Sequence, residues 1–135
     1  MKKLFDNAIE DIINDKKINN ISLKNIDIIK YVLNDKNMNK KLYKNFKNNY
    51  ESIYGDDIEC LYMKVEDMIY RCHLLINSVI IDKYGITDKN SIKDAINLYL
   101  DSDYCDLFDS VSYDDSDFEF VDNYANDIVD YLIHS

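Results

Sequence analysis

The sequence contains no proline and no tryptophan, and Gly55 and Gly85 are its only glycines. Tight β-turns depend on glycine and proline, so their scarcity argues against an all-β fold, which needs many such turns. Nucleotide-binding loops such as G-x-G-x-x-G and the P-loop need several glycines close together. Two isolated glycines exclude both loops, and we expect no cofactor.

Cysteine and histidine are also few, and they are scattered along the chain. A structural zinc site needs four such ligands at close spacings, so we expect no metal centre. Three cysteines without paired spacing do not indicate a secreted disulfide framework, and reduced thiols are typical of a cytoplasmic protein. We interpret His73 as a largely structural side chain whose nitrogens are satisfied by neighbours; a general base beside a cysteine nucleophile is the alternative. The candidate metal ligands or nucleophiles are Cys60, Cys72, His73, Cys105 and His134.

The 135 residues are 47% hydrophobic, which is enough to fold as one domain over 1–135 despite a net charge of -10. Lysine, asparagine, isoleucine and aspartate are abundant, a bias that indicates an AT-rich coding sequence from a low-GC bacterium, a phage or a virus. The N-terminus starts like a signal peptide, but Asp6, Glu10 and Asp11 interrupt the apolar region that such a peptide needs. No run of 18 apolar residues is present, so we expect a cytoplasmic protein with no membrane segment.

Hydrophobic periodicity predicts an all-α fold, a single-domain bundle of about five to six helices. Amphipathic patterns predict helices over 2–16 and about 38–54. A further helix is expected after Ser22, which we interpret as its N-cap. The pairs Ser91 with Asp94 and Ser116 with Glu119 resemble capping boxes that open two more helices.

The longest periodic segment, 57–84, is expected to be the central helix of the bundle. Its apolar residues recur at spacings of three and four, and its second half is apolar on nearly every side. An intermolecular coiled coil is an alternative, but the apolar stripe is wider than a coiled-coil seam. The β-branched residues of the second half also leave a buried strand as an alternative. Gly85 is expected to end this helix.

Charge is divided unequally along the chain. Residues 1–50 hold 11 lysines against 6 acids (+5), whereas residues 51–135 hold 5 basic residues against 20 acids (-15), which together give the net charge of -10. Nine of the acids lie between Asp101 and Asp122, interleaved with aromatic residues and without a basic residue. Acids flanking aromatic anchors favour encounter with a basic protein surface. The predicted partner-binding residues are Asp101, Asp103, Tyr104, Asp106, Phe108, Asp109, Tyr113, Asp114 and Asp115.

The acidic stretch does not match a calcium-binding loop. It begins with the D-x-D spacing of an EF-hand, but the sixth position is Asp106 where glycine is needed and the twelfth is Ser112 where glutamate is needed. No carboxylate pair is marked out by its spacing as a hydrolytic centre. We therefore expect a protein that is not an enzyme.

The sequence leads to two hypotheses of function. The first is an acidic binding protein that occupies and blocks a basic partner, as toxin-immunity proteins and phage inhibitors of nucleases or defence effectors do. The alternative is a viral helical protein of the Bcl-2 type, whose central helix helps to form a groove for a partner helix. A solvated acidic loop without a partner is the structural explanation of the same residues. Because the net charge is negative and the lysines are mostly balanced by acids, we do not favour direct binding of nucleic acid.

Overall fold

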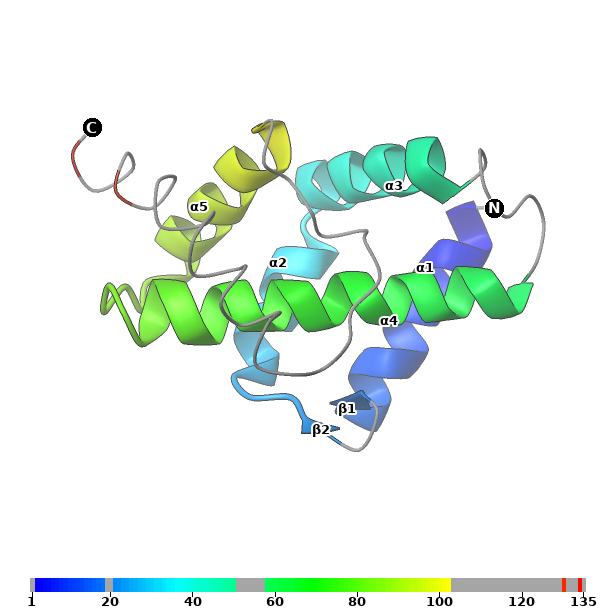
Figure 1. Cartoon of the computed structure of the whole chain (residues 1–135), viewed down its shortest axis with the longest axis horizontal. Coiled ribbons are helices and arrows are strands. Elements are labelled where there is room, and N and C mark those ends of the chain that lie inside the picture. The colour runs from blue at the N-terminus through cyan, green and yellow to red at the C-terminus, as the bar shows by residue number, and fades with distance from the viewer. Residues whose placement is uncertain (1, 19–20, 51–57, 103–129, 131–133, 135) are drawn as a thin grey trace.

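The computed structural model describes residues 2–18, 21–50, 58–102, 130 and 134. Helices dominate this part of the chain, and the only strands in it form a hairpin with two residues on each side, so the predicted all-α fold is confirmed (Figure 1). In chain order the elements are α1 (Lys2–Asp15), β1 (Lys17–Ile18), β2 (Ile21–Ser22), α2 (Ile26–Asn34), α3 (Lys36–Tyr50), α4 (Ile58–Leu74), the π-helical segment η1 (Leu75–Ile81) and α5 (Lys89–Asp101).

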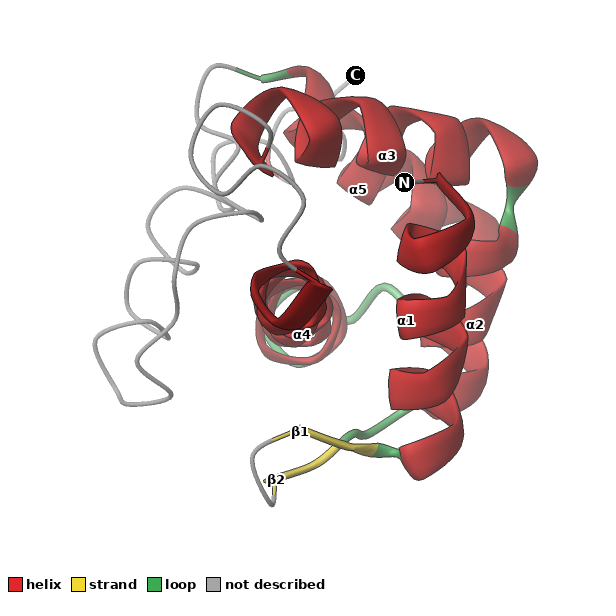
Figure 2. Ribbon diagram, turned by 90° about the vertical axis from the view of Figure 1, so that its right-hand side faces the viewer, coloured by secondary structure: helices red, strands yellow, loops and turns green. Residues whose placement is uncertain are grey.

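The centre of the bundle is α4 with its continuation η1, as the periodicity of 57–84 predicts. Every residue from Met68 to Asn77 is buried, so this stretch is enclosed on all sides. Seen along its axis, α4 has α1 and α2 on one side and α3 above it, while the β1–β2 hairpin lies below (Figure 2). The buried hydrophobic side chains of the described residues form a single cluster.

The contact between α1 and α3 depends on an aromatic group. Phe5 is fully buried, and its ring centroid lies 4.9 Å from that of Phe46 and 5.4 Å from that of Tyr43. At the rim of this contact the Lys2 ammonium donates to the Asp6 carboxylate at 2.7 Å and to the Asn39 side-chain oxygen at 2.6 Å. Aromatic burial in the centre and a polar rim together hold the two helices in one arrangement.

The start of α2 differs from the prediction. Ser22 is not an N-cap, because it lies in β2, where it pairs with Lys17. The helix begins four residues later, after Asn25, whose φ of 52° is left-handed. Asparagine adopts this conformation more readily than most residues, and the Asn25 carbonyl accepts the amides of Ile28 and Ile29. Serine is a common N-cap by residue type, but the turn before α2 requires a residue that tolerates a positive φ, which asparagine does.

Two aspartates cap the later helices. Asp35 separates α2 from α3 and accepts the Met38 amide at 3.1 Å through its carboxylate, so α3 begins at Lys36 rather than at 38. Asp88 caps α5 by accepting the Ser91 amide at 3.0 Å. The predicted box of Ser91 and Asp94 is therefore wrong, because Ser91 is the third residue inside the helix and not its cap.

The end of the central helix widens into η1. The side-chain amide of Asn77 donates to the His73 carbonyl at 3.1 Å. In a regular α-helix this carbonyl would accept the backbone amide of Asn77. The amides of Asp82 and Tyr84 bond carbonyls five residues back, at Asn77 and Val79. Gly85 then leaves the helix with a left-handed φ of 68°, and its predicted role as the terminating residue is confirmed.

The predicted terminal helix opened by Ser116 and Glu119 lies outside the described residues, as do Gly55 and residues 51–54 of the predicted third helix. In the part of the chain that the structure describes, no helix is both long and apolar enough to cross a membrane.

Candidate functional site

Of the nine predicted partner-binding residues, the structure describes Asp101. It is the last residue of α5, and its side chain is 58% exposed. Its carboxylate accepts a bond from the Lys41 ammonium at 2.8 Å, and the same ammonium donates to Asn97 at 2.7 Å. The first acid of the stretch is thus tied to α3. The other predicted residues, which lie outside the described part of the chain, are Asp103, Tyr104, Asp106, Phe108, Asp109, Tyr113, Asp114 and Asp115.

A second group of acids and apolar residues, not predicted as a site, lies where α1 packs against the first half of α4. We call it the acidic face, and it consists of Asp11 and Asp15 of α1 with Tyr62, Met63 and Glu66 of α4. On α4 the three residues recur at helical spacing, at i, i+1 and i+4, while Leu61 and Val65 of the same turns are buried. The buried side chains fix the helix against α1, and the acidic face points outward.

The carboxylates of the acidic face lie close enough to influence one another. Burial and the charge of Asp15 raise the pKa of Glu66 above its ordinary value. Burial and the charges of Glu66, Asp11 and Asp15 likewise raise the pKa of the Tyr62 hydroxyl. No lysine or arginine of the described residues forms an ion pair with Asp11, Asp15 or Glu66. The described residues therefore leave the negative charge of this face without a paired cation.

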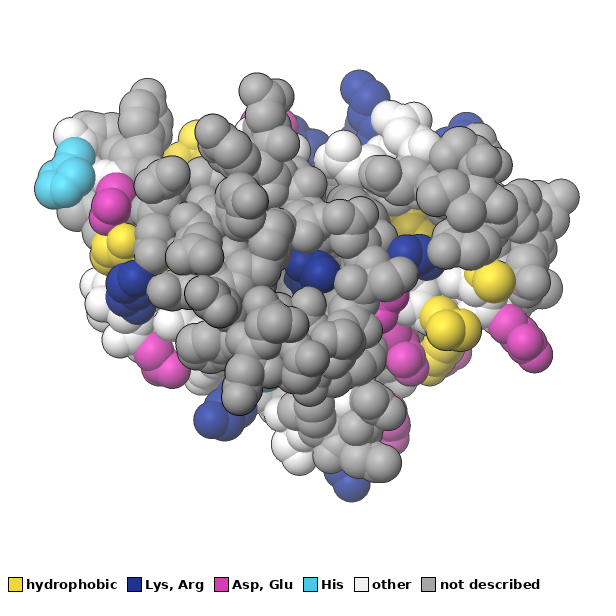
Figure 3. Space-filling model, viewed as in Figure 1, with side chains coloured by type: hydrophobic (Ala, Val, Ile, Leu, Met, Phe, Trp, Pro, Cys, Tyr) yellow, Lys and Arg dark blue, Asp and Glu magenta, His cyan; other side chains and the backbone are white. Residues whose placement is uncertain are grey.

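Apolar side chains are exposed in the same place. Met63 is 64% exposed and Tyr62 is 38% exposed, which places both among the few large hydrophobic side chains that the described residues leave open to solvent. Figure 3 shows yellow hydrophobic and magenta acidic side chains next to one another over α1 and the first half of α4. Tyrosine and methionine are enriched in protein interfaces, and acids beside them select a basic partner. The sequence carries a signal for this face in 59–66, where Tyr62 and Met63 lie between Glu59 and Glu66.

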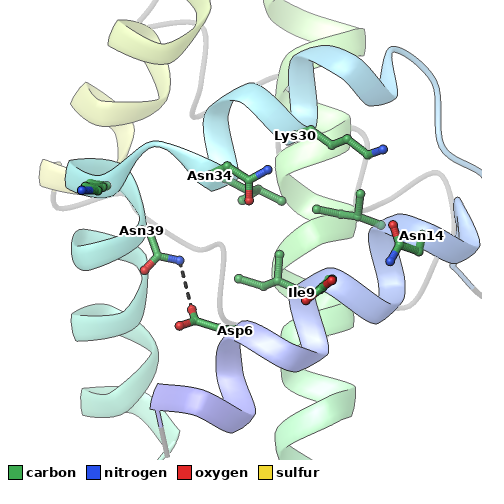
Figure 4. Close-up of a pocket in the computed structure, with 10 residues that line it drawn as sticks. Asp6, Ile9, Asn14, Lys30, Asn34 and Asn39 are labelled. Atoms are coloured by element: carbon green, nitrogen blue, oxygen red, sulfur yellow. Dashed lines mark hydrogen bonds between the residues drawn. The ribbon is translucent and has the colours of Figure 1, made fainter.

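A pocket of about 510 Å³ lies between α1, α2 and α3 (Figure 4). Ile9, Ile13 and Leu33 form its apolar part, and Asp6 bonds the Asn39 side-chain amide at 3.2 Å at one end. Most of the lining is polar, and neither cysteine nor histidine is included. The remaining lining residues are Glu10, Asn14, Lys30, Asn34 and Lys36.

His73 and Asn77 make a polar contact between the central helix and the segment before α2. His73 is only 7% exposed, and its Nε2 accepts the Lys24 amide at 3.2 Å. Asn77 donates to the Lys24 carbonyl at 3.4 Å and accepts a bond from the Asn25 side chain. Burial and the charge of Lys24 lower the pKa of His73, which favours the neutral ring that this bond requires.

The interpretation of His73 as a structural residue is therefore half right. Its Nε2 is satisfied as expected, but its Nδ1 is buried and has no hydrogen-bond partner among the described residues. Cys60 is partly exposed and Cys72 is buried, whereas Cys105 lies outside the described residues. Among the residues described, no three histidine, cysteine or acidic side chains come together in a way that could hold a metal ion.

No family model matches this chain, and neither does any curated protein or solved structure.

Proposed function

We propose that this protein is a non-enzymatic binding protein that covers a basic surface of another protein with its acidic face. The observation that carries the proposal is the combination, on one face, of two exposed apolar side chains and three carboxylates that form no ion pair with a described lysine or arginine. Burial and the charge of Asp15 raise the pKa of Glu66, so the ionised carboxylate is disfavoured there. A partner lysine or arginine placed at this position would offset the repulsion from Asp15 and so favour binding.

The two kinds of side chain serve different parts of binding. Tyr62 and Met63 supply apolar area that can enter a pocket of the partner, which is the usual source of affinity. The acids speed the encounter with a positively charged surface and reject acidic proteins. Proteins that act on nucleic acids have basic surfaces of this kind, so we propose a nuclease or another nucleic-acid effector as the partner that is blocked. The acids predicted over 101–115 would add to the same complementarity.

The groove hypothesis has less support. A Bcl-2-type protein needs an apolar groove along its central helix, where a partner helix inserts several apolar side chains. The pocket between α1, α2 and α3 is lined mainly by charged and amide side chains, and α4 contributes no residue to it. No feature of the described residues favours this function over the acidic binding protein.

The test compares two variants with the same change of net charge. In the face variant Asp11 and Asp15 become asparagine and Glu66 becomes glutamine; in the control variant Asp27, Asp82 and Asp94, which are exposed elsewhere, become asparagine. Each protein is used to capture partners from a lysate of a low-GC bacterium at 50 and 300 mM salt. Partners identified by mass spectrometry are then purified, and their dissociation constants for each variant are measured.

We expect a basic protein that binds the wild type and the control variant at low salt, is released at high salt, and binds the face variant at least tenfold more weakly. Replacement of Met63 by alanine should also weaken this complex without changing its salt dependence. Equal dissociation constants for the face and control variants would refute the acidic face as the binding surface. A partner of acidic charge would refute the proposed partner class.

A further inference from the structure

The positive charge of the N-terminal part of the chain is concentrated in one helix. Residues 1–35 contain six lysines and six acids, whereas residues 36–50 contain five lysines and no acid. The whole excess of +5 over residues 1–50 therefore comes from α3. The balance between lysines and acids inferred from the sequence holds for the residues before α3 but not for α3 itself.

Four of the five lysines form one exposed row on α3, which we call the lysine face. They are Lys36, Lys40, Lys44 and Lys47, all exposed, and they follow one another at intervals of four, four and three residues. At a rise of about 1.5 Å per residue the row extends over roughly 16 Å. Lys41 points elsewhere and bonds Asn97 and Asp101.

None of the four lysines of this row forms an ion pair with the residues that the structure describes. The opposite side of α3 is held in the core by Met38, Leu42 and Phe46, so the helix cannot turn its lysines inward. Dark blue side chains project along the upper edge of the molecule, where α3 lies (Figure 3). The result is a fixed row of cations on an otherwise acidic protein.

The lysine face also lacks exposed apolar residues. Between residues 36 and 48 every large hydrophobic side chain is buried or partly buried, and the other exposed side chains there are asparagines. A helix that binds a lipid surface needs an apolar side that can enter the membrane, and a protein interface needs apolar or aromatic anchors. A row of cations and amide donors alone fits a polyanion whose charges are evenly spaced and exposed, as phosphates are.

We propose that the lysine face binds the sugar-phosphate backbone of nucleic acid without reading its bases. Phosphates of one strand of a duplex are spaced about 3.4 Å apart along the axis, so the row spans roughly five of them. The negative charge of the rest of the protein is screened beyond a Debye length, about 10 Å at 0.1 M salt. The proposal uses residues of α3 only and does not rest on the proposed function, which uses α1 and α4.

The test measures binding of a fluorescently labelled 20-base-pair DNA duplex by anisotropy between 50 and 200 mM KCl. In the α3 variant Lys40, Lys44 and Lys47 become alanine, which is a good helix former at exposed positions. In the control variant the exposed lysines Lys3, Lys17 and Lys24 become alanine, so both variants lose three positive charges. Circular dichroism checks that each variant is folded.

If all four lysines meet phosphates, the logarithm of the wild-type affinity falls with a slope of about 3.6 against the logarithm of salt concentration, close to a hundredfold loss over this range. The α3 variant should show a slope of about 0.9, a loss of only a few-fold, and weaker binding at 50 mM, while the control variant follows the wild type. No binding by the wild type at 50 mM, or equal weakening by both variants, would overturn the proposal. Equally effective competition by polyglutamate would also overturn it, because the face would then serve acidic proteins.

Discussion

The acidic face and the lysine face are built on the same core but differ in what surrounds their charges. The acidic face places Asp15 and Glu66 beside Tyr62 and Met63, so its charge is partly shielded from water and adjoins apolar area. The lysine face consists of exposed cations three or four residues apart, and every large hydrophobic side chain between residues 36 and 48 is buried or partly buried. The first arrangement suits a compact protein interface, and the second suits a flexible or extended polyanion. Net charge alone does not distinguish these two uses of a surface.

The largest loss of stability is expected from replacement of Phe5. Its ring joins α1, which carries part of the acidic face, to α3, which carries the lysine face. Replacement of Phe5 by alanine should lower the free energy of unfolding by about 3–5 kcal/mol, since a fully buried ring is lost and leaves a cavity against Phe46 and Tyr43. Chemical denaturation followed by circular dichroism measures this change. Both binding activities should decline together once the folded fraction falls, whereas Phe5→Leu should lose less. A stability change below about 1 kcal/mol for Phe5→Ala would contradict the assigned packing.

A smaller effect on stability, one that depends on pH, is expected from His73, which belongs to neither face. Its pKa is lowered in the folded protein, so the unfolded chain binds more protons below the ordinary value of 6.5. Stability from the bond to Lys24 should therefore be present above pH 6.5 and decline as the pH falls below it. The pH dependence of unfolding between pH 8 and 5 measures this, with His73→Gln as the comparison. An equally steep decline in the glutamine variant would assign the effect to other groups.

A still smaller change of stability is expected from Glu66. In the proposed function its carboxylate supports binding, but in the free protein the same charge should decrease stability. The pKa of Glu66 is raised in the folded state, so above pH 4.5 the folded protein keeps this proton more readily than the unfolded chain does. Stability therefore decreases as the pH rises through that range. Replacement of Glu66 by glutamine should therefore increase stability at pH 7, by about 0.5 kcal/mol or less for a half-buried site. The gain should disappear below pH 4.5. Replacement of Lys44, which has lysines four residues before it and three residues after it, should change stability equally at pH 7 and below pH 4.5, because lysine keeps its charge over that range.

Much of the fold could be predicted from the sequence because helical periodicity reports burial directly. The central helix, the apolar residues of α1 and the terminating Gly85 all follow from the spacing of hydrophobic residues and from one special conformation. The caps could not be chosen in the same way, because serine and aspartate are both good caps and only the chain geometry selects between Asp88 and Ser91. The widened turn of η1 contains Asn77, whose side chain also bonds Lys24 and Asn25, and contacts between residues so far apart in the chain do not follow from a local pattern.

The candidate sites are harder to predict, because the order of charges along the chain does not show which of them lie together on the surface. The unequal charge of the two halves indicates the C-terminal acidic stretch, most of which lies outside the described residues, and does not single out α3. In three dimensions Asp15 lies close enough to Glu66, more than fifty residues further along the chain, to raise its pKa, and the charges of Asp11 and Asp15 both act on Tyr62. A helical-face count over 36–50 would have found the lysine face, because it needs no tertiary contact.

Asp101 is a predicted partner-binding acid, and its carboxylate accepts a bond from Lys41 of α3, the helix that carries the lysine face. Replacement of Asp101 by asparagine removes an exposed ion pair with Lys41, so stability should change by less than about 1 kcal/mol. The same change removes the carboxylate that neutralises Lys41, which adds an unpaired cation on the helix of the lysine face. Duplex DNA should therefore bind a few-fold more tightly at 50 mM salt. Asp94→Asn, an exposed site elsewhere on α5, is the matched control. Equal gains for both variants would show that net charge, and not the position of Lys41, governs the interaction.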